Sequence, residues 1–401
     1  MITFTFISLP LLISAIVLAI PVFVFVLEVC ASFFISQRNQ SLSLKRDSKS
    51  RVAVIIPAHN EGAGLVPTLH DVKAGIRPDD CILVVADNCS DDTSAVAASH
   101  GAAVFERNEP TRRGKGFAIA AGLKHLTTLP PDIVIVIDAD CRLEPGALEL
   151  LAATCTQTNR PVQANYVMRA PAGAAIKTRV AEFAHLVKDT VRPLGLKAFR
   201  LPCQLAGTGM AFPWEVIRSV DLESGSLVED LKLGLDLART GHPPIYQPWA
   251  NVYSEFPSSD KGLQSQRLRW EQGHLRMILV SAPLSILAAL SRANLELLAM
   301  ALDMAVPPLT LLLMLSLGIS FLAACATLVG ASIFPFFVSA ISTLSLSFAV
   351  FVIWLGYGRD ILPPHDALSI LQYVLGKLGI YTRIFSSRSP SEWVRTDREK
   401  H

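Results

Sequence analysis

The chain has 401 residues, of which 51% are hydrophobic and only 17% are charged, whereas an ordinary soluble domain is nearer a quarter charged. Its formal net charge of +2 excludes the strong electrostatic footprint of a nucleic-acid-binding protein. Seven cysteines without a CxxC pair argue against a disulfide framework or a zinc site and indicate reduced thiols in a cytosolic compartment.

Residues 1–37 predict an N-terminal transmembrane helix. Glu28 is the one charged residue among the first 36, and the apolar run over residues 9–36 exceeds the ~20 residues that span a bilayer. A cleaved signal peptide is the alternative, but the segment has no basic start and is too long for that purpose. Arg38, Lys45 and Arg46 follow, so the positive-inside rule predicts that the next part of the chain is cytoplasmic.

Residues 38–275 predict an α/β domain with a mostly parallel sheet. Strand-like runs alternate with helix-like segments, which is the pattern of βαβ units. The strands are expected at 51–58, 81–87 and 133–140, and the helices at 65–74, 93–100 and 116–126. The chain contains neither GxGxxG nor GxxxxGK[ST]. It therefore lacks the phosphate-binding loops of dinucleotide-dependent oxidoreductases and of P-loop proteins.

The third strand runs directly into two acids, Asp138 and Asp140. Two acids one residue apart on a strand point to the same face, and isolated carboxylates are costly to desolvate. At the carboxyl end of a parallel strand that face looks into the crevice where α/β sheets bind ligands. We therefore expect a shared positive partner there, a divalent cation that carries a phosphate.

The C-terminal part predicts further membrane helices. The apolar block 297–358 is interrupted at 329–335, which gives two spans, at 304–328 and 334–357. Asp303 is expected to be a snorkelled or partnered acid at a helix end. Residues 276–296 are interrupted by a proline and charges and are interpreted as interfacial helices, with a fourth span as the alternative. Residues 359–401 then form a cytoplasmic tail.

Several polar motifs follow one another along the chain: Asp87–Thr93 (DNCSDDT), Arg112–Gly116 (RRGKG), Asp138–Asp140 (DAD), Gly207–Phe212 (GTGMAF), Val228–Asp230 (VED), Gln266–Trp270 (QRLRW) and Trp393–Thr396 (WVRT). Taken singly they are ambiguous: the first could be a polar turn with an N-cap, and the second a solvated basic loop. Together, in content and order, they resemble an inverting family 2 glycosyltransferase with a GT-A (Rossmann-like) fold. The QxxRW motif resembles the membrane-embedded branch of cellulose, chitin, hyaluronan and bacterial exopolysaccharide synthases.

The resemblance implies a donor site for a nucleotide sugar, expected to be UDP-linked. Asp140, with Asp138 beside it, would hold Mg²⁺ or Mn²⁺, which prefer oxygen ligands and phosphate oxygens; Asp138 would lie nearer the sugar. Glu61 and Asp87 match positions that contact the nucleoside, and Lys115 could pair with the diphosphate or the base-side pocket. For Glu61 the alternative is an acid that merely complements a helix N-terminus.

The same resemblance implies the catalytic residues. Asp230 is expected to be the general base that takes the acceptor proton, with Glu229 as the alternative. Gln266, Arg269 and Trp270 would complete the site, because arginine can bind phosphate oxygens and tryptophan offers a flat face for a sugar ring. The alternative for this motif is an amphipathic helix at the membrane interface. His274 could line the same channel or simply be packed.

The expected function is transfer of a sugar with inversion to a growing glycan in exopolysaccharide synthesis, by an integral protein of the inner cell membrane whose catalytic domain is cytoplasmic. Its partners would be the nucleotide sugar, a glycan or lipid-linked acceptor, membrane lipids and polysaccharide export proteins. Transfer of a single sugar to a polyprenyl phosphate or glycolipid is the alternative. An inactive scaffold would have lost its acids, and a transporter would carry acids within its spans, so both are disfavoured.

Overall fold

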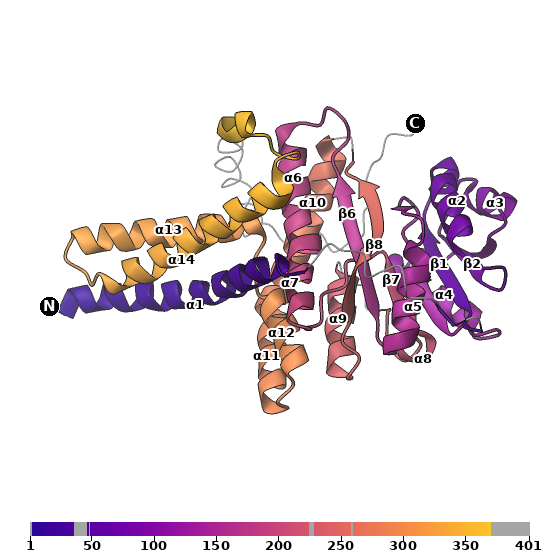
Figure 1. The fold of residues 1–401 in the computed structure, drawn as a ribbon, viewed down its shortest axis with the longest axis horizontal. Helices are drawn as coiled ribbons and strands as arrows, with labels where there is room; N and C mark the ends of the chain where they lie inside the picture. Colours follow the sequence, from indigo (N-terminus) through magenta and orange to yellow (C-terminus); the bar gives the residue numbers. More distant parts are fainter. Residues whose placement is uncertain (1, 36–45, 48, 224–227, 258–259, 370–401) are drawn as a thin grey trace. The chain divides into compact units, whose positions relative to one another are not determined.

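The computed structural model describes residues 2–35, 46–47, 49–223, 228–257 and 260–369. The expected WVRT motif and most of the expected C-terminal tail lie outside these residues. The described chain divides into two compact units. We call them the sheet unit, which contains all the strands, and the helical unit, which contains the long apolar helices (Figure 1). Helix α10 (Asp260–Arg276) passes from the first unit to the second after Gly273.

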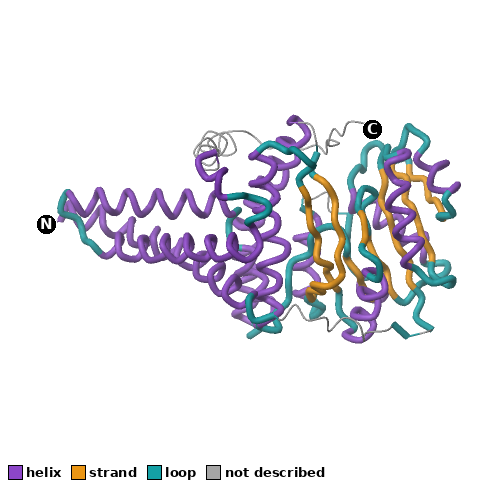
Figure 2. The backbone as a smooth tube through the Cα atoms, turned by 45° about the horizontal axis from the view of Figure 1, so that its top comes forward, coloured by secondary structure: helices purple, strands orange, loops and turns teal. Residues whose placement is uncertain are grey.

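The sheet unit is built on one eight-stranded sheet with the strand order β3-β2-β1-β4-β7-β6-β8-β5. Figure 2 shows its strands side by side, with helices packed along them. The strands are β1 (Val52–Ala58), β2 (Cys81–Asp87), β3 (Ala103–Arg107), β4 (Ile133–Val136), β5 (Arg142–Leu143), β6 (Val162–Arg169), β7 (Met210–Pro213) and β8 (Ile245–Glu255).

The first four strands of the chain are parallel to one another, as the alternating pattern predicted. β7 then pairs antiparallel with both β4 and β6, so the sheet is mixed and mostly parallel. β1, β2 and β4 are almost wholly buried, which is why they appear in the sequence as continuous apolar runs. Their carboxyl ends lie at the same edge of the sheet, and that edge carries the candidate site.

The predicted helices of this unit are present within a residue or two of their expected bounds. Gly62 and the residues after it form a short 3₁₀ turn, η2 (Gly62–Leu65). The α-helices are α2 (Val66–Gly75), α3 (Thr93–Ser99), α4 (Lys115–Leu126), α5 (Ala147–Thr158), α8 (Trp214–Ile217) and α9 (Glu229–Arg239).

One expectation about this unit was wrong in detail. Asp138 and Asp140 do not lie on the strand, because β4 ends at Val136 and the two acids occupy the turn that follows. The ladder continues for one more hydrogen bond, from the Ile137 amide to the Ile55 carbonyl at 3.1 Å. A turn suits the acids better, because their carboxylates are then not forced into the buried faces of the sheet.

The helical unit contains α1, a helix broken by a π-turn over residues 176–198, and the C-terminal helices. Its core is formed by valines, leucines and aromatic side chains of α1, α6, α13 and α14. The elements are α1 (Ile2–Ser32), α6 (Ile176–Leu186), η3 (Val187–Val191), α7 (Arg192–Ala198), η4 (Met277–Ser281), α11 (Ala282–Ser291), α12 (Leu295–Met304), α13 (Leu309–Leu328), α14 (Phe334–Ile353), η5 (Trp354–Gly358) and η6 (Pro364–Asp366).

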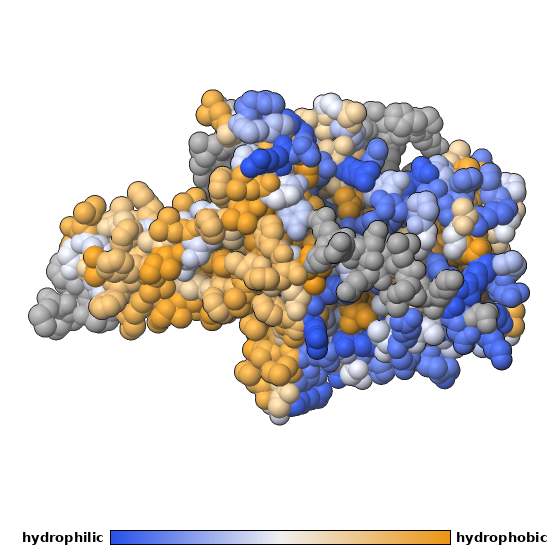
Figure 3. All heavy atoms as spheres, in the orientation of Figure 1, coloured by the Kyte–Doolittle hydropathy of each residue, from blue (hydrophilic) through white to orange (hydrophobic). Residues whose placement is uncertain are grey.

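Four helices are long and apolar enough to cross a membrane: Ile7–Ser32, Gln266–Ser291, Leu309–Leu328 and Phe334–Gly358. Three of them match the expected spans, and the fourth covers the QxxRW motif and part of the segment interpreted as interfacial. Figure 3 shows apolar residues gathered on the surface of α1, α13 and α14, where exposed side chains include Phe23 and Phe321. An apolar surface of this extent is typical of a membrane-facing bundle.

The segment 276–296, interpreted as interfacial helices, contains η4, α11 and the first residues of α12. α11 ends at Ser291 and α12 begins at Leu295, with Asn294 Oδ1 accepting the Leu297 amide at 2.9 Å as an N-cap. α12 ends at Met304, and α13 begins only at Leu309. Two consecutive prolines, Pro307 and Pro308, explain the break, since neither can continue a helix. In Figure 1, α11 and α12 run across the direction shared by α1, α13 and α14.

A buried ionic cluster joins three helices of this unit. Arg192 Nε donates to Glu28 Oε2 at 2.6 Å, and its Nη2 donates to Asp303 Oδ1 at 2.5 Å and to the Asp303 carbonyl at 2.7 Å. Asp303 is therefore a partnered acid, as expected. α7 can approach α1 this closely because Gly195 faces Glu28, where a β-carbon would lie 1.9 Å from the Glu28 carbonyl oxygen. His274 is also packed, with its Nε2 3.2 Å from the Met304 carbonyl.

Candidate active site

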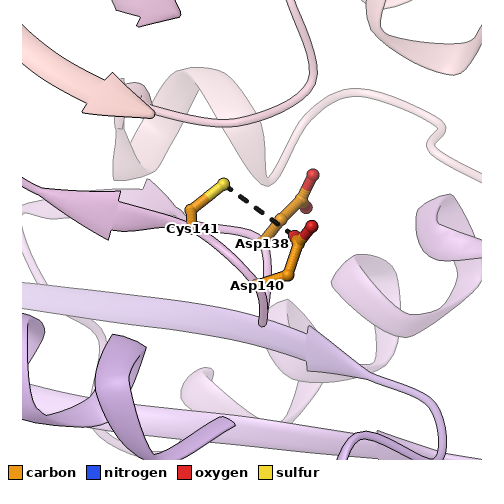
Figure 4. Close-up of side chains that lie close together, drawn as sticks. All are labelled: Asp138, Asp140 and Cys141. Carbon is orange, nitrogen blue, oxygen red and sulfur yellow. Dashed lines mark hydrogen bonds between the residues drawn. The ribbon is translucent and has the colours of Figure 1, made fainter. Parts of the chain in front are cut away.

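The candidate metal ligands lie in the turn after β4. One ligand atom each from Asp138, Asp140 and Cys141 lies within 4.8 Å of the others (Figure 4). The Cys141 sulfur is 4.0 Å from Asp140 Oδ1 and is fully buried. Burial, together with the charges of Asp140 and Asp138, raises the pKa of the Cys141 thiol. A thiol held protonated is a poor ligand, so the donors of this turn are carboxylate oxygens, which fit Mg²⁺ or Mn²⁺.

Lys115, the first residue of α4, is hydrogen-bonded to Asp138 Oδ1 and, at 2.9 Å, to the Gly207 carbonyl. Burial by itself would lower the pKa of the Lys115 ammonium, but the charge of Asp138 and the hydrogen bond to it outweigh burial and the pKa is raised. Lys115 thus holds its positive charge at the centre of the site. It also engages one oxygen of Asp138.

The loop that precedes β7 closes around these groups. The Asp138 amide donates to Thr208 Oγ1 at 3.0 Å, and the Thr208 hydroxyl donates to the Cys141 sulfur at 3.4 Å. Gly207 and Gly209 both have positive φ angles, of 89° and 65°, which a residue with a side chain adopts only at a cost. A β-carbon on Gly209 would also lie 2.6 Å from Ala164 Cβ. These two backbone conformations explain why the GTG motif has glycine at positions 207 and 209.

Glu229 and Asp230 lie in the first turn of α9, and Asp230 faces this loop. A β-carbon on Gly207 would lie 3.5 Å from Asp230 Oδ2 and 3.6 Å from Lys115 Nζ, which places Asp230 and Lys115 on the same side of Gly207. Burial raises the pKa of Glu229 to about 7, Lys115 opposes that shift, and Asp230 adds to it. The helix N-terminus favours negative charge at both positions.

Helix α10 brings the QxxRW motif against the start of α9. Gly273 packs on Val228, the residue before Glu229, where a β-carbon would lie 2.5 Å from Val228 Cγ1. Arg269 interacts electrostatically with Glu229. Gln266 is buried, and its Oε1 has no hydrogen-bond partner among the described residues. Trp270 is partly buried. Sequence reasoning missed Gly273, although a glycine within an otherwise regular helical segment was a signal of close packing.

The two residues expected to contact a nucleoside lie at the carboxyl ends of the adjacent strands β1 and β2. Glu61 occupies the N-cap position of the 3₁₀ turn η2 without a capping hydrogen bond from its side chain, and its amide donates to Thr93 Oγ1 at 2.9 Å. Asp87 ends β2 and is paired with Arg107 at the end of β3, with Arg107 Nη1 donating to Asp87 Oδ1 at 2.5 Å. Arg107 was not singled out in the sequence, because no spacing rule links two strand ends 20 residues apart.

Comparison with known proteins agrees with this geometry. The family described as "Glycosyltransferase like family 2" matches residues 50–273, which is more than half of the chain. An uncharacterized glycosyltransferase of Mycobacterium tuberculosis H37Rv is 42% identical over 102 residues, 25% of this chain and 42% of that protein. Poly-beta-1,6-N-acetyl-D-glucosamine synthase of Staphylococcus epidermidis is 22% identical over 261 residues, 62% of this chain and 61% of that protein. The matches therefore cover less than two thirds of these relatives.

The fold is shared with a solved structure, mannosyltransferase PcManGT from Pyrobaculum calidifontis in complex with GDP-Man and Mn²⁺. The TM-score is 0.51 at 16% identity, and the alignment covers 93% of this chain and 99% of that one. At that identity the likeness concerns the fold alone. The family match over residues 50–273 and the acids assembled after β4 lead to one conclusion: the chain belongs to glycosyltransferase family 2.

Proposed function

We propose that this protein transfers a sugar, with inversion, from a UDP-linked donor to a hydroxyl of a growing cell-surface glycan. One observation carries the proposal. Lys115 is hydrogen-bonded to Asp138, one of two acids that suit a divalent cation, and it lies with Asp230 on the same side of Gly207. A transferase that releases a diphosphate needs these three elements: positive charge for the leaving group, a metal to neutralise it and a base for the acceptor.

Each residue has a proposed part in this reaction. Asp140, with Asp138, would hold the metal ion, which neutralises charge on the diphosphate as the sugar–phosphate bond breaks. Lys115 would add a positive charge beside the leaving group, which requires it to exchange Asp138 for a phosphate oxygen. Asp230 would take the proton from the acceptor hydroxyl as its oxygen attacks the anomeric carbon. The proximity of Asp230 to Gly207 and Lys115 supports this role.

Residues of α10 are proposed to complete the site. Arg269 would bind phosphate oxygens, and the Trp270 ring would support an acceptor sugar. Gln266 Oε1, buried with no partner among the described residues, would accept a hydrogen bond from a sugar hydroxyl, because an unpaired buried acceptor is otherwise costly. Glu61 and Asp87 are proposed to contact the nucleoside.

A membrane location and a polymeric product are also proposed. The four apolar helices support an integral membrane protein, and the positive charge after residue 37 supports a cytoplasmic catalytic domain. The staphylococcal relative's name, a poly-beta-1,6-N-acetyl-D-glucosamine synthase, supports a polymer. Partner proteins for export would then receive the product.

The test uses membranes that contain the full chain, Mg²⁺ or Mn²⁺, and a panel of radiolabelled nucleotide sugars, with the label sorted by solvent extraction and by size. Label in a long, solvent-insoluble product is expected, whereas label confined to the lipid extract would indicate single transfer to a lipid carrier. Asp230→Asn should abolish incorporation, and Glu229→Gln should retain a measurable part of it. Equal incorporation by wild type and Asp230→Asn would refute the assignment of the base.

A further inference from the structure

Asp87 is held by a residue that no motif indicated. Asp87 and Arg107 are Cα partners in the parallel pairing of β2 with β3, and each is the last residue of its strand. The Asn88 amide donates to the Arg107 carbonyl at 2.6 Å and extends this ladder beyond the strand ends. Both side chains of the pair are buried. The backbone therefore fixes the guanidinium and the carboxylate opposite each other.

All the hydrogen bonds of the Asp87 carboxylate within the described residues fall on one oxygen. Arg107 Nη1 donates to Oδ1 at 2.5 Å, and Asn88 Nδ2 donates to the same atom at 2.9 Å. The backbone beside it is also held, because His59 Nδ1 donates to the Asp87 carbonyl at 2.6 Å. Oδ2 is thus the oxygen left to accept a hydrogen bond from a ligand, and its direction is set by the two donors on Oδ1.

Arg107 is itself fixed on its other sides. Its Nη2 donates to Glu109 Oε2 at 2.9 Å, and its guanidinium lies 5.6 Å from the centre of the Phe117 ring. Arginine presents its donors in a rigid planar fork, whereas lysine presents a single mobile charge. A guanidinium held at three points can hold a carboxylate in one orientation, and charge-assisted bonds of this kind are about twice as strong as neutral ones.

We infer that Arg107 is a positioning residue of the nucleoside half of the donor site: it orients Asp87 so that Oδ2 accepts an N–H or O–H group of the nucleoside. The inference rests on the proposed function, because Asp87 has a ligand only if the chain binds a nucleotide sugar. It assigns no contact with the diphosphate to Arg107. Arg107 acts only through Asp87.

The experiment measures binding rather than turnover. The purified full chain in detergent is titrated with UDP, with GDP, with uridine and with inorganic pyrophosphate, each in the presence of Mn²⁺. Arg107→Met should weaken binding of the nucleoside diphosphate by about tenfold and leave pyrophosphate affinity within about twofold of wild type, since the loss of one charge-assisted hydrogen bond is of that size. Asp87→Asn should weaken binding similarly. The double variant should bind no more weakly than the more affected single variant, because both changes disrupt the same Arg107–Asp87 pair.

Arg142→Met provides a control, because Arg142 also pairs with an acid of the sheet unit, in this case Asp71 and through two hydrogen bonds, and the change should leave nucleotide binding unchanged. Arg107→Lys keeps the charge, should fold, and should bind several-fold more weakly than wild type. Wild-type affinity in both Arg107 variants, or an equal loss for nucleotide and pyrophosphate, would overturn the inference. A wild-type chain that binds neither UDP nor GDP would instead overturn the proposed function.

Discussion

Replacing Arg192 by methionine should strongly destabilise the helical unit. The side chains of Arg192, Glu28 and Asp303 are 7%, 4% and 8% exposed, so the change leaves two carboxylates buried without their shared cation. Removing one member of a buried ion pair costs about 3–5 kcal/mol. For a chain of this size that corresponds to a fall in melting temperature on the order of 4–6 °C.

The assay is thermal unfolding of the purified chain in detergent, followed by a thiol-reactive dye that reports the buried cysteines. Arg218→Met is the matched control: Arg218 pairs with Glu215 at 2.6 Å, but their side chains are 55% and 71% exposed, and such exposed pairs contribute little. Adding Glu28→Gln and Asp303→Asn to Arg192→Met should recover most of the loss, because no buried charge then remains. If Arg192→Met melts within about 1 °C of wild type, the three charges are not buried together and the reasoning fails.

Three further predictions concern the sheet unit. Asp140→Asn should reduce Mn²⁺ affinity at least tenfold, measured by electron paramagnetic resonance of free Mn²⁺, whereas Asp71→Asn should not change it; removal of the metal with a chelator should abolish transfer by the wild type. Gly273→Val should lower activity far more than Gly318→Val, because a side chain at 273 meets Val228 beside the proposed base, whereas a β-carbon on the helical Gly318 would have nothing within 4 Å; equal effects would contradict the packing. The pKa of Glu229 is raised from 4.5 to about 7, so protonation of Glu229 favours the folded state between these pH values. Relative to Glu229→Gln, the melting temperature of the wild type should therefore fall as pH rises from 4.5 to 7. A melting temperature that rises over this range would contradict the raised pKa.

Much of the fold was predictable because its signals are local. Each buried parallel strand appears as an apolar run, and each run is followed by polar residues at the edge where parallel strands present their ligands. The strand bounds at β1 and β2 were therefore predicted almost to the residue. The acids after β4 were predicted to form a metal site. Their position in a turn was not predicted, because an apolar run does not show at which residue the hydrogen bonds between strands end. The family was predictable from the order of its motifs.

The tertiary structure decided which of these residues touch. Nothing in the spacing of Asp87 and Arg107 indicates a pair, and only the register of β2 on β3 makes them opposite. Similarly, Glu28 and Asp303 lie 275 positions apart in the sequence and share Arg192 because Gly195 lets two helices meet. The hydrophobic periodicity of a helix or strand indicates which of its residues are buried, since burial depends on the face of that element on which a residue lies. The identity of a buried charge's partner depends on how elements pack, and that information is not contained in any single segment of the chain.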